Sequence, residues 1–240
     1  MESKRLNLRR IISLICYLVL IPFVVAFGYY LFKNKNYNLI SIIVCILAII
    51  PFFVKFEFSR NSAREIVIVG VMVALSVVSR VIFSATPGFK PIASIIIISG
   101  VAFGGEIGFI VGALSALISN FFFGQGSWTP FQMFAWGFVG LISGFVKLKD
   151  RKTNLIYIVI VGIISGIIYS VLMDYYTTVS VYNTFNLSAY FMFLGNGLPF
   201  MITYAVSNVL FLIILYFPLT KKLGRIKLKY AVFNYHWVDN

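Results

Sequence analysis

Long apolar stretches alternate with short polar ones along the whole chain. A helix needs roughly 17–25 apolar residues to cross the hydrocarbon core of a bilayer, and several of these stretches reach that length. The pattern predicts eight membrane-spanning helices, at residues 11–32, 38–55, 65–83, 90–104, 107–123, 131–147, 154–174 and 191–218. The predicted fold class is therefore all-α, a polytopic membrane helical bundle.

The apolar stretch 92–122 leaves two interpretations open. A single helix over these residues would be about 46 Å long, too long for a hydrocarbon core of about 30 Å. The sequence Gly104-Gly105-Glu106 offers a break, although the two helices that it leaves are short. With the break the chain crosses the membrane eight times; without it, the chain crosses seven times.

The distribution of charge favours the break. The chain has 20 Lys and Arg residues against 7 Asp and Glu, a net charge of +13, and its basic residues gather in the short polar segments. Basic residues favour cytoplasmic loops, and with eight spans and both termini inside, 16 of the 20 face the cytoplasm. With seven spans the basic segments near residues 147–152 and 221–229 would face outward. We therefore expect eight spans with both termini cytoplasmic.

This topology divides the chain into four parts and exposes three segments on the outer side. We expect an N-terminal transmembrane hairpin (1–57), a cytoplasmic linker (58–64), a six-span unit (65–220) and a basic cytoplasmic tail (221–240). The expected outer segments are the loop 84–91, the stretch 121–131 and a long turn around 174–190.

Composition narrows the function classes. The chain is 60% hydrophobic and 11% charged, with a mean hydropathy of +0.96, which is far from the balance of a soluble domain. No basic stripe alternates with aromatic residues on a polar helix, so we expect no nucleic-acid partner. There is no P-loop motif, and the single histidine, His236, lies in the C-terminal tail. We therefore expect neither an enzyme nor a metal site.

The outer stretch FFFGQGSWTPFQMFAWG, Phe121–Gly137, carries most of the candidate chemistry. Pro130 suits the first turn of a helix and Thr129 suits its N-cap, so Gln132 and Trp136 would share one helix face near the outer surface. An aromatic belt at the membrane interface accounts for the tryptophans but not for the glutamines. We assign a substrate-binding role to five residues of this region: Asn120, Gln125, Trp128, Gln132 and Trp136.

Two charged residues lie at a similar predicted depth. Arg80 is near the outer end of the third span, where it either faces a partner or cavity or extends to the lipid headgroups. Asp174, at the outer end of the seventh span, could pair with Arg80 or bind a ligand. Both are candidate substrate-binding residues, as is Asn196 in the last span.

Small residues recur at four-residue spacing in several spans. Such spacing lets helix backbones approach closely. Internal packing is the expected role of most of these pairs, and some could instead face another membrane subunit. The pairs are Gly70 and Ala74, Gly108 and Gly112 with Ala116, Gly140 and Gly144, and Gly162 and Gly166.

The six-span unit resembles the S components, the substrate-binding membrane subunits of energy-coupling factor (ECF) vitamin transporters. The resemblance covers about residues 63–220, and its most specific part is the pattern G-Q-G-x-W-T-P-x-Q-M-F-A-W-G. Within the family the chain looks most like a branch associated with cobalamin or its precursors. The N-terminal hairpin is additional to the usual six spans.

The resemblance implies a division of labour. An S component captures a vitamin-like compound outside the cell and docks on a module of one membrane coupling protein and two ATPases, which hydrolyse ATP. Family members carry a small-x-x-x-small motif for docking, which Gly70 and Ala74 match here, with glycine in place of the more usual alanine. The resemblance thus implies a multi-pass protein of a prokaryotic plasma membrane with no cofactor of its own.

Two other functions remain open from the sequence. A stand-alone secondary permease would need a coupling-ion site, and only Arg80 and Asp174 are intramembrane ionisable candidates. A non-transporting membrane scaffold would use the indoles only as interfacial anchors.

Overall fold

The structure is a computed structural model that describes residues 11–32, 36–56, 62–146 and 151–233. This described part is all helical, with eight helices and no strand. The first helix includes a π-helical turn, η1 (Cys16–Leu20), which ends two residues before Pro22. Proline has no N–H to donate to the helix. The elements are η1, α2 (Ile21–Phe32), α3 (Tyr37–Phe56), α4 (Ser62–Ile82), α5 (Ile92–Phe103), α6 (Gly105–Phe123), α7 (Thr129–Ser143), α8 (Arg151–Tyr182) and α9 (Leu187–Tyr230).

Each predicted span coincides with one of these helices. Five described helices are long and apolar enough to cross a membrane, and α5 and the first part of α3 are shorter apolar helices. The chain is thus a multi-pass membrane protein, while the number of crossings and the side of the termini stay predictions. The break at Gly104 is confirmed: its φ of 98° and ψ of 161° suit glycine, and they separate α5 from α6.

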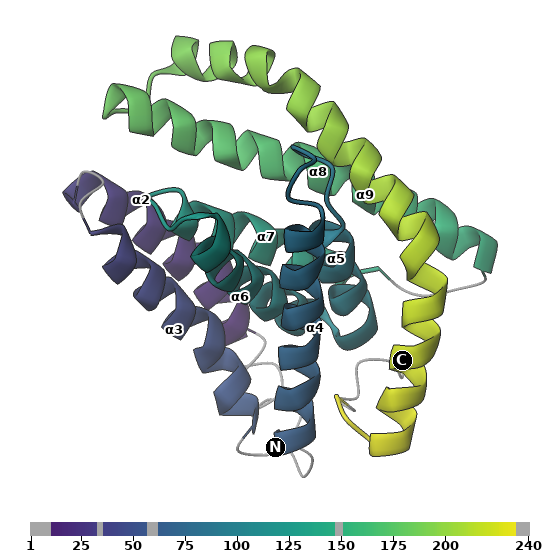
Figure 1. Cartoon of the computed structure of the whole chain (residues 1–240). Helices are drawn as coiled ribbons and strands as arrows, with labels where there is room; N and C mark the ends of the chain where they lie inside the picture. Colours follow the sequence, from purple (N-terminus) through teal and green to yellow (C-terminus); the bar gives the residue numbers. More distant parts are fainter. Residues whose placement is uncertain (1–10, 33–35, 57–61, 147–150, 234–240) are drawn as a thin grey trace.

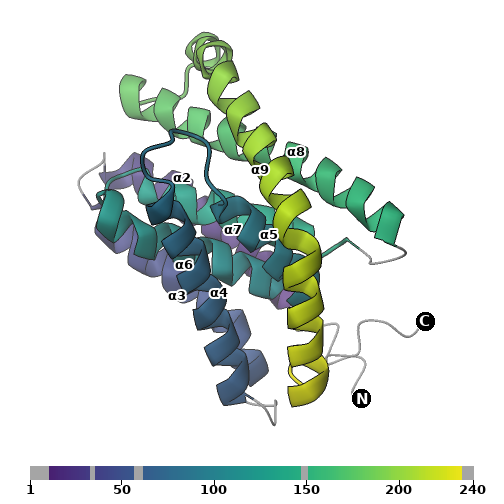
Figure 2. The same cartoon turned by 45° about the vertical axis from the view of Figure 1, so that its right-hand side comes forward.

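Helices α6 and α7 occupy the middle of the bundle. The hairpin α2–α3 packs on one side of them, α4 and α5 lie on another, and the long pair α8–α9 crosses a third (Figures 1 and 2). A Cβ on Gly108 would overlap the carbonyl oxygen of Gly140, and the reverse also holds. These glycines therefore let the two backbones touch, the internal packing expected for this pair.

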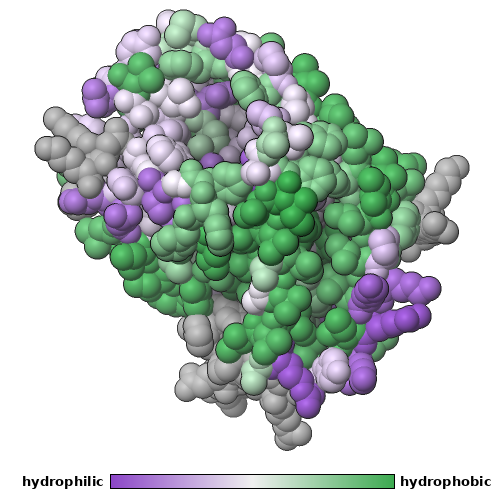
Figure 3. All heavy atoms as spheres, viewed as in Figure 1, coloured by the Kyte–Doolittle hydropathy of each residue, from purple (hydrophilic) through white to green (hydrophobic). Residues whose placement is uncertain are grey.

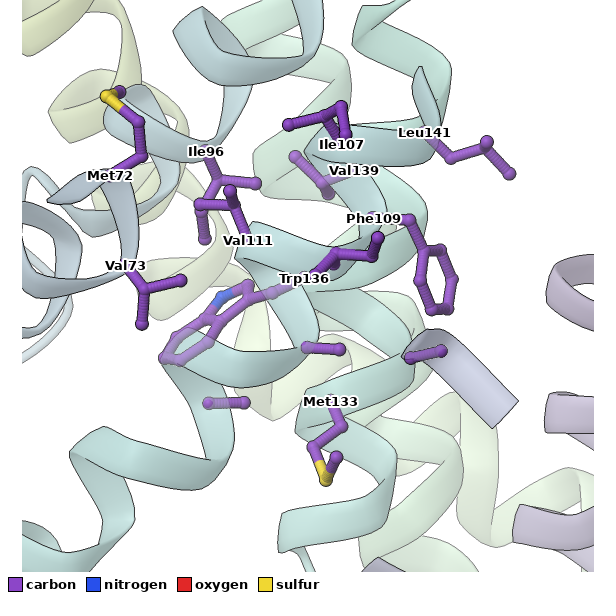
Figure 4. Packing of buried hydrophobic residues seen from close by; sticks show 14 of the residues in the cluster. Met72, Val73, Ile96, Ile107, Phe109, Val111, Met133, Trp136, Val139 and Leu141 are labelled. Atoms are coloured by element: carbon purple, nitrogen blue, oxygen red, sulfur yellow. The ribbon is translucent and has the colours of Figure 1, made fainter. Parts of the chain in front are cut away.

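The core between these helices is built mostly of aliphatic side chains. Met72 and Val73 of α4, Ile96 of α5 and Trp136 of α7 belong to this one buried cluster, in which Val73 lies beside the indole of Trp136 (Figure 4). Phe109 of α6 is fully buried and stacks on Tyr17 of the first helix, with ring centroids 4.2 Å apart. The N-terminal hairpin is therefore joined to the central pair by a buried aromatic contact rather than by surface contacts alone.

The prediction of a long turn at 174–190 is wrong. Helix α8 continues through Tyr182, and only residues 183–186 connect it to α9. The segment 174–182 has no Gly or Pro to end the helix, and the hydroxyls of Thr177 and Thr178 donate to the carbonyls four residues back. The two threonine hydroxyls thus bond within the helix, and the polarity that suggested a turn does not end it.

The basic segment that follows the last predicted span is also helical as far as Tyr230, because α9 continues through it. At this end of the molecule the backbone N–H of Phe233 donates to the buried Glu65 carboxylate of α4, at 2.7 Å. The ring of Phe233 lies 4.7 Å from that of Phe103. The start of α4, the end of α5 and the end of α9 thus meet at the predicted cytoplasmic end.

Residues predicted on the outer side gather at the opposite end. Ser127 shares a hydrogen bond of 2.8 Å with Tyr176, and the backbone N–H of Lys90 donates to Ser207 at 2.9 Å. Seen from the side, an apolar surface lies between two more hydrophilic ends, and the upper one is hollowed (Figure 3).

Candidate binding site

A small cavity lies toward the predicted outer end, enclosed by helices α4, α5, α7, α8 and α9 and by the loop 83–91. Its volume is about 60 Å³, room for a few water molecules. Twelve residues line it: Arg80, Lys90, Ile92, Ala93, Gln132, Trp136, Val139, Ser165, Gly166, Tyr169, Tyr204 and Asn208. Three of the predicted site residues, Arg80, Gln132 and Trp136, thus face one space.

Arg80 reaches the cavity from α4 and is held by neutral groups. Its guanidinium donates to the Ser119 hydroxyl and, at 2.8 Å, to the side-chain oxygen of Asn120. It also lies over the rings of Phe123 and Trp136, 4.4 and 5.0 Å from their centroids. Among the described residues Arg80 has no carboxylate partner. Its positive charge therefore lines the cavity without being neutralised.

Asn120 determines how the neighbouring amide is oriented. Its Nδ2 donates to Gln132 Oε1 at 2.9 Å, so the Gln132 Nε2 is left to donate to the Tyr169 hydroxyl at 3.1 Å. All three side chains are buried. Because Tyr169 accepts this bond, its own proton points away from Gln132. The Gln132 amide is therefore held in one orientation beside the cavity.

The aromatic part of the cavity is a pair of stacked rings. Trp136 of α7 and Tyr169 of α8 stack with centroids 5.5 Å apart and planes 15° from parallel. Tyr204 of α9 meets Tyr169 edge-on, with centroids 5.0 Å apart. Flat rings beside donors suit a planar heterocycle that carries acceptors.

The loop 83–91 carries the second cation of the site. Lys90 lies 4.8 Å from the centroid of Phe123, the ring that Arg80 also covers. Partial burial, and then the charge of Arg80, lower the pKa of Lys90 from its ordinary value. Two hydrogen bonds to Ser207 of α9, one from the Lys90 N–H and one to its carbonyl, hold this residue in place.

Gln125 and Thr129 support the cavity from behind instead of lining it. Gln125 donates to the Leu117 carbonyl at 2.9 Å and accepts from the Thr129 hydroxyl at 3.0 Å. That hydroxyl also accepts from Asn120 at 3.0 Å. The prediction that Thr129 is the N-cap of α7 is wrong. The N-cap is Trp128, whose side chain makes no capping hydrogen bond, and the Thr129 hydroxyl bonds instead to these upstream partners.

Three predicted site residues lie away from the cavity. Trp128 covers Gly126 and is partly exposed, and Asn196 is exposed on α9. Asp174 lies against Gly197, and its Oδ2 has no hydrogen-bond partner. The possible pairing of Asp174 with Arg80 is not seen. Both helices bring these residues near the outer end, but their rotation turns Asp174 toward α9 and Arg80 toward α6.

Five polar lining residues escaped the sequence analysis: Lys90, Ser165, Tyr169, Tyr204 and Asn208. Lys90 had a usable signal, since it was a basic residue expected on the outer side. Tyr169, Tyr204 and Asn208 lie within apolar spans that carry many aromatic residues, and nothing in their spacing marks the side that faces the cavity. Within the described residues, no group of three or more His, Cys, Asp or Glu side chains could hold a metal.

The fold and the cavity together define a helical membrane protein with one small polar site toward one end. A family model described as "ECF-type riboflavin transporter, S component" matches residues 60–225, more than two thirds of the chain. The chain therefore belongs to this family of transport subunits and is an ECF S component. The match starts after the N-terminal hairpin and gives no support to the cobalamin branch. No curated protein and no solved structure matches the chain significantly.

Proposed function

We propose that this chain captures a planar, vitamin-like heterocycle at the outer side of the membrane and delivers it inward after docking on an ATP-hydrolysing module. The observation that carries the proposal is the convergence of Arg80, Gln132 and the stacked pair Trp136–Tyr169 on one cavity. Stacking surfaces hold a flat ring, and amide and guanidinium donors fix its orientation. The chain itself acts as a binding and transport subunit.

A flavin-sized ring is the favoured substrate. The description of the matching family names riboflavin. A corrinoid, which the sequence resemblance favoured, is several times larger, whereas the cavity of about 60 Å³ is already smaller than the roughly 300 Å³ of typical ligand pockets. The site must open for either compound, and the smaller molecule demands less movement of α8, α9 and the loop 83–91.

Alanine substitutions test the site. Gln132→Ala and Trp136→Ala should each weaken riboflavin binding by the purified protein by about tenfold or more, since each removes a buried polar or stacking contact. Trp128→Ala is the matched control, because that indole lies outside the cavity. The measurement is quenching of flavin fluorescence in an equilibrium titration. Equal affinities for all three variants and the wild type would refute the site, and binding of a corrinoid instead of riboflavin would refute the substrate.

The proposed docking surface is the side of α4 that carries Gly70 and Ala74. Both residues are exposed, and a Cβ on Gly70 would meet nothing within 4 Å. The glycines of α6 and α7, in contrast, are used up by internal contacts. A membrane coupling protein could therefore approach the backbone of α4 closely. The two ATPases and this coupling protein are the partners that the family implies.

Gly70→Leu should abolish ATP-dependent uptake in cells or vesicles that contain the coupling module, and should leave ligand binding unchanged. The leucine fills the space where the partner helix would lie, far from the cavity. Gly224→Leu on α9, where a Cβ also meets nothing, is the control and should still transport. Uptake by the purified chain alone would favour a permease, and a protein that neither binds nor transports would favour a scaffold.

A further inference from the structure

Two cations of the cavity share one aromatic ring, and in the described part of the chain no carboxylate is paired with either of them. Arg80 and Lys90 lie 4.4 and 4.8 Å from the centroid of Phe123, so at most about 9 Å separates the two charged groups. No carboxylate lines the cavity. Two like charges this close repel each other, and the partial burial of both groups strengthens the repulsion.

A buried hydroxyl that lines the same cavity also bears on what the cavity could hold. The Ser165 hydroxyl of α8 lines the cavity, is buried, and has no hydrogen-bond partner among the described residues. Leaving a buried hydroxyl unpaired is costly, and such groups usually meet a ligand or water.

We infer that the cavity is built for an anionic oxygen group of about two negative charges, such as a phosphate monoester, attached to the captured ring. Arg80 and Lys90 would neutralise the charge, and the hydroxyl of Ser165 would donate to one of the oxygens. A phosphate monoester carries about −1.5 to −2 at pH 7, which matches two cations better than a carboxylate does. This inference rests on the proposed function but concerns the charge of the substrate, not its ring.

The test compares two ligands that differ only in a phosphate. Riboflavin and its 5′-phosphate (FMN) are titrated into the protein in dodecyl maltoside, a detergent without phosphate. The expected result is at least about tenfold tighter binding of FMN, because a partly buried charge pair forms only with FMN. FMN affinity equal to or below that of riboflavin would overturn the inference and leave the proposed function intact.

Variants assign the preference to these residues. Lys90→Gln and Arg80→Gln should each reduce the ratio of FMN to riboflavin affinity toward one, and Lys90→Arg should keep most of it because it retains the charge. Lys222→Gln, a charge removal on the exposed end of α9, should not alter the ratio. A ratio unchanged in Lys90→Gln and Arg80→Gln would overturn the assignment even if FMN binds more tightly.

Inorganic phosphate makes the inference testable even if neither flavin binds. Saturable quenching of tryptophan fluorescence by phosphate, lost in Lys90→Gln, would then support the anion site and refute only the flavin. No response to phosphate, together with no preference for FMN, would overturn it. Phosphate could also come from a lipid headgroup: if a short-chain phosphatidylglycerol binds in the same Lys90-dependent way and FMN does not compete with it, the site holds lipid and the substrate inference is wrong.

Discussion

Asn120 takes part in three of the site's hydrogen bonds. Its oxygen accepts from Arg80, and its Nδ2 donates to both Gln132 and Thr129. It is fully buried, so water cannot replace these partners. One side chain thereby sets the position of the guanidinium and the orientation of the Gln132 amide.

Two serines of α6 allow the Arg80 contact to be tested at fixed burial. Ser115 and Ser119 are both fully buried and one helical turn apart, but only the Ser119 hydroxyl accepts from Arg80, whereas that of Ser115 has no partner. Ser119→Ala should reduce stability by about 1.5–3 kcal/mol, since a hydrogen bond to a charged group is lost. Ser115→Ala should be neutral or stabilising. Thermal unfolding of the purified variants measures both, and equal effects would contradict the assigned contact.

At the scale of elements, the close approach of α6 and α7 fixes where the site residues point. Gly108 and Gly140 contact each other's backbone, and Gly144 contacts Gly105 in the same way. This leaves little freedom for α7 to rotate or slide, and α7 carries Gln132 and Trp136. The precision of the cavity wall thus depends on glycines that lie outside the cavity.

Gly140→Ala should therefore lower the unfolding temperature by several degrees or prevent folding, because the added methyl would meet the Gly108 backbone, and overpacking of this kind costs about 1–3 kcal/mol or more. Gly224→Ala, in an open part of α9, should instead be neutral or raise stability by about 0.4–1 kcal/mol. Fluorescence-detected size-exclusion chromatography after heating compares the two. Tolerance of Gly140→Ala would show that the helices are less tightly packed than described.

The sequence predicted where the helices lie better than which side of each helix faces the cavity. Apolar length located every helix, and Gly104 was recognised because charge and bilayer thickness required a break there. Polarity misled at 174–182, where a run of Thr and Tyr residues continues a helix, and at Thr129, whose hydroxyl turns to Asn120 and Gln125. Tyr169 and Tyr204 could not be selected, because helix rotation is set by tertiary contacts that an apolar span does not encode locally.

At the scale of the whole molecule, the cavity and the contacts of the C-terminal segment are at opposite ends. The cavity lies at one end, and at the other the segment after α9 folds back on α4 through the Phe233–Glu65 hydrogen bond and the contact of Arg64 with the Tyr230 ring, 5.3 Å from its centroid. The exposed side of α4 with Gly70 lies between these ends. Helix α4 therefore connects the cavity-lining residue Arg80, the proposed docking surface and the C-terminal segment.

Glu65→Ala should release the segment after Tyr230 without disturbing the cavity. The substitution removes the buried acceptor of the Phe233 N–H, so amide hydrogen exchange of residues 231–233 should become faster. Exchange in α7 should stay unchanged and serves as the internal control. Unaltered exchange at 231–233 would show that other contacts hold the segment.

The small volume of the cavity has a kinetic consequence. A site that holds a few waters admits a vitamin only after the surrounding helices part, so the apparent dissociation constant equals the intrinsic one divided by the fraction of open molecules. If opening comes first, the observed association rate should level off as ligand concentration rises, at a value set by the protein alone. The same barrier would slow escape of a captured molecule, which would suit a subunit that must keep a scarce compound until its partner arrives.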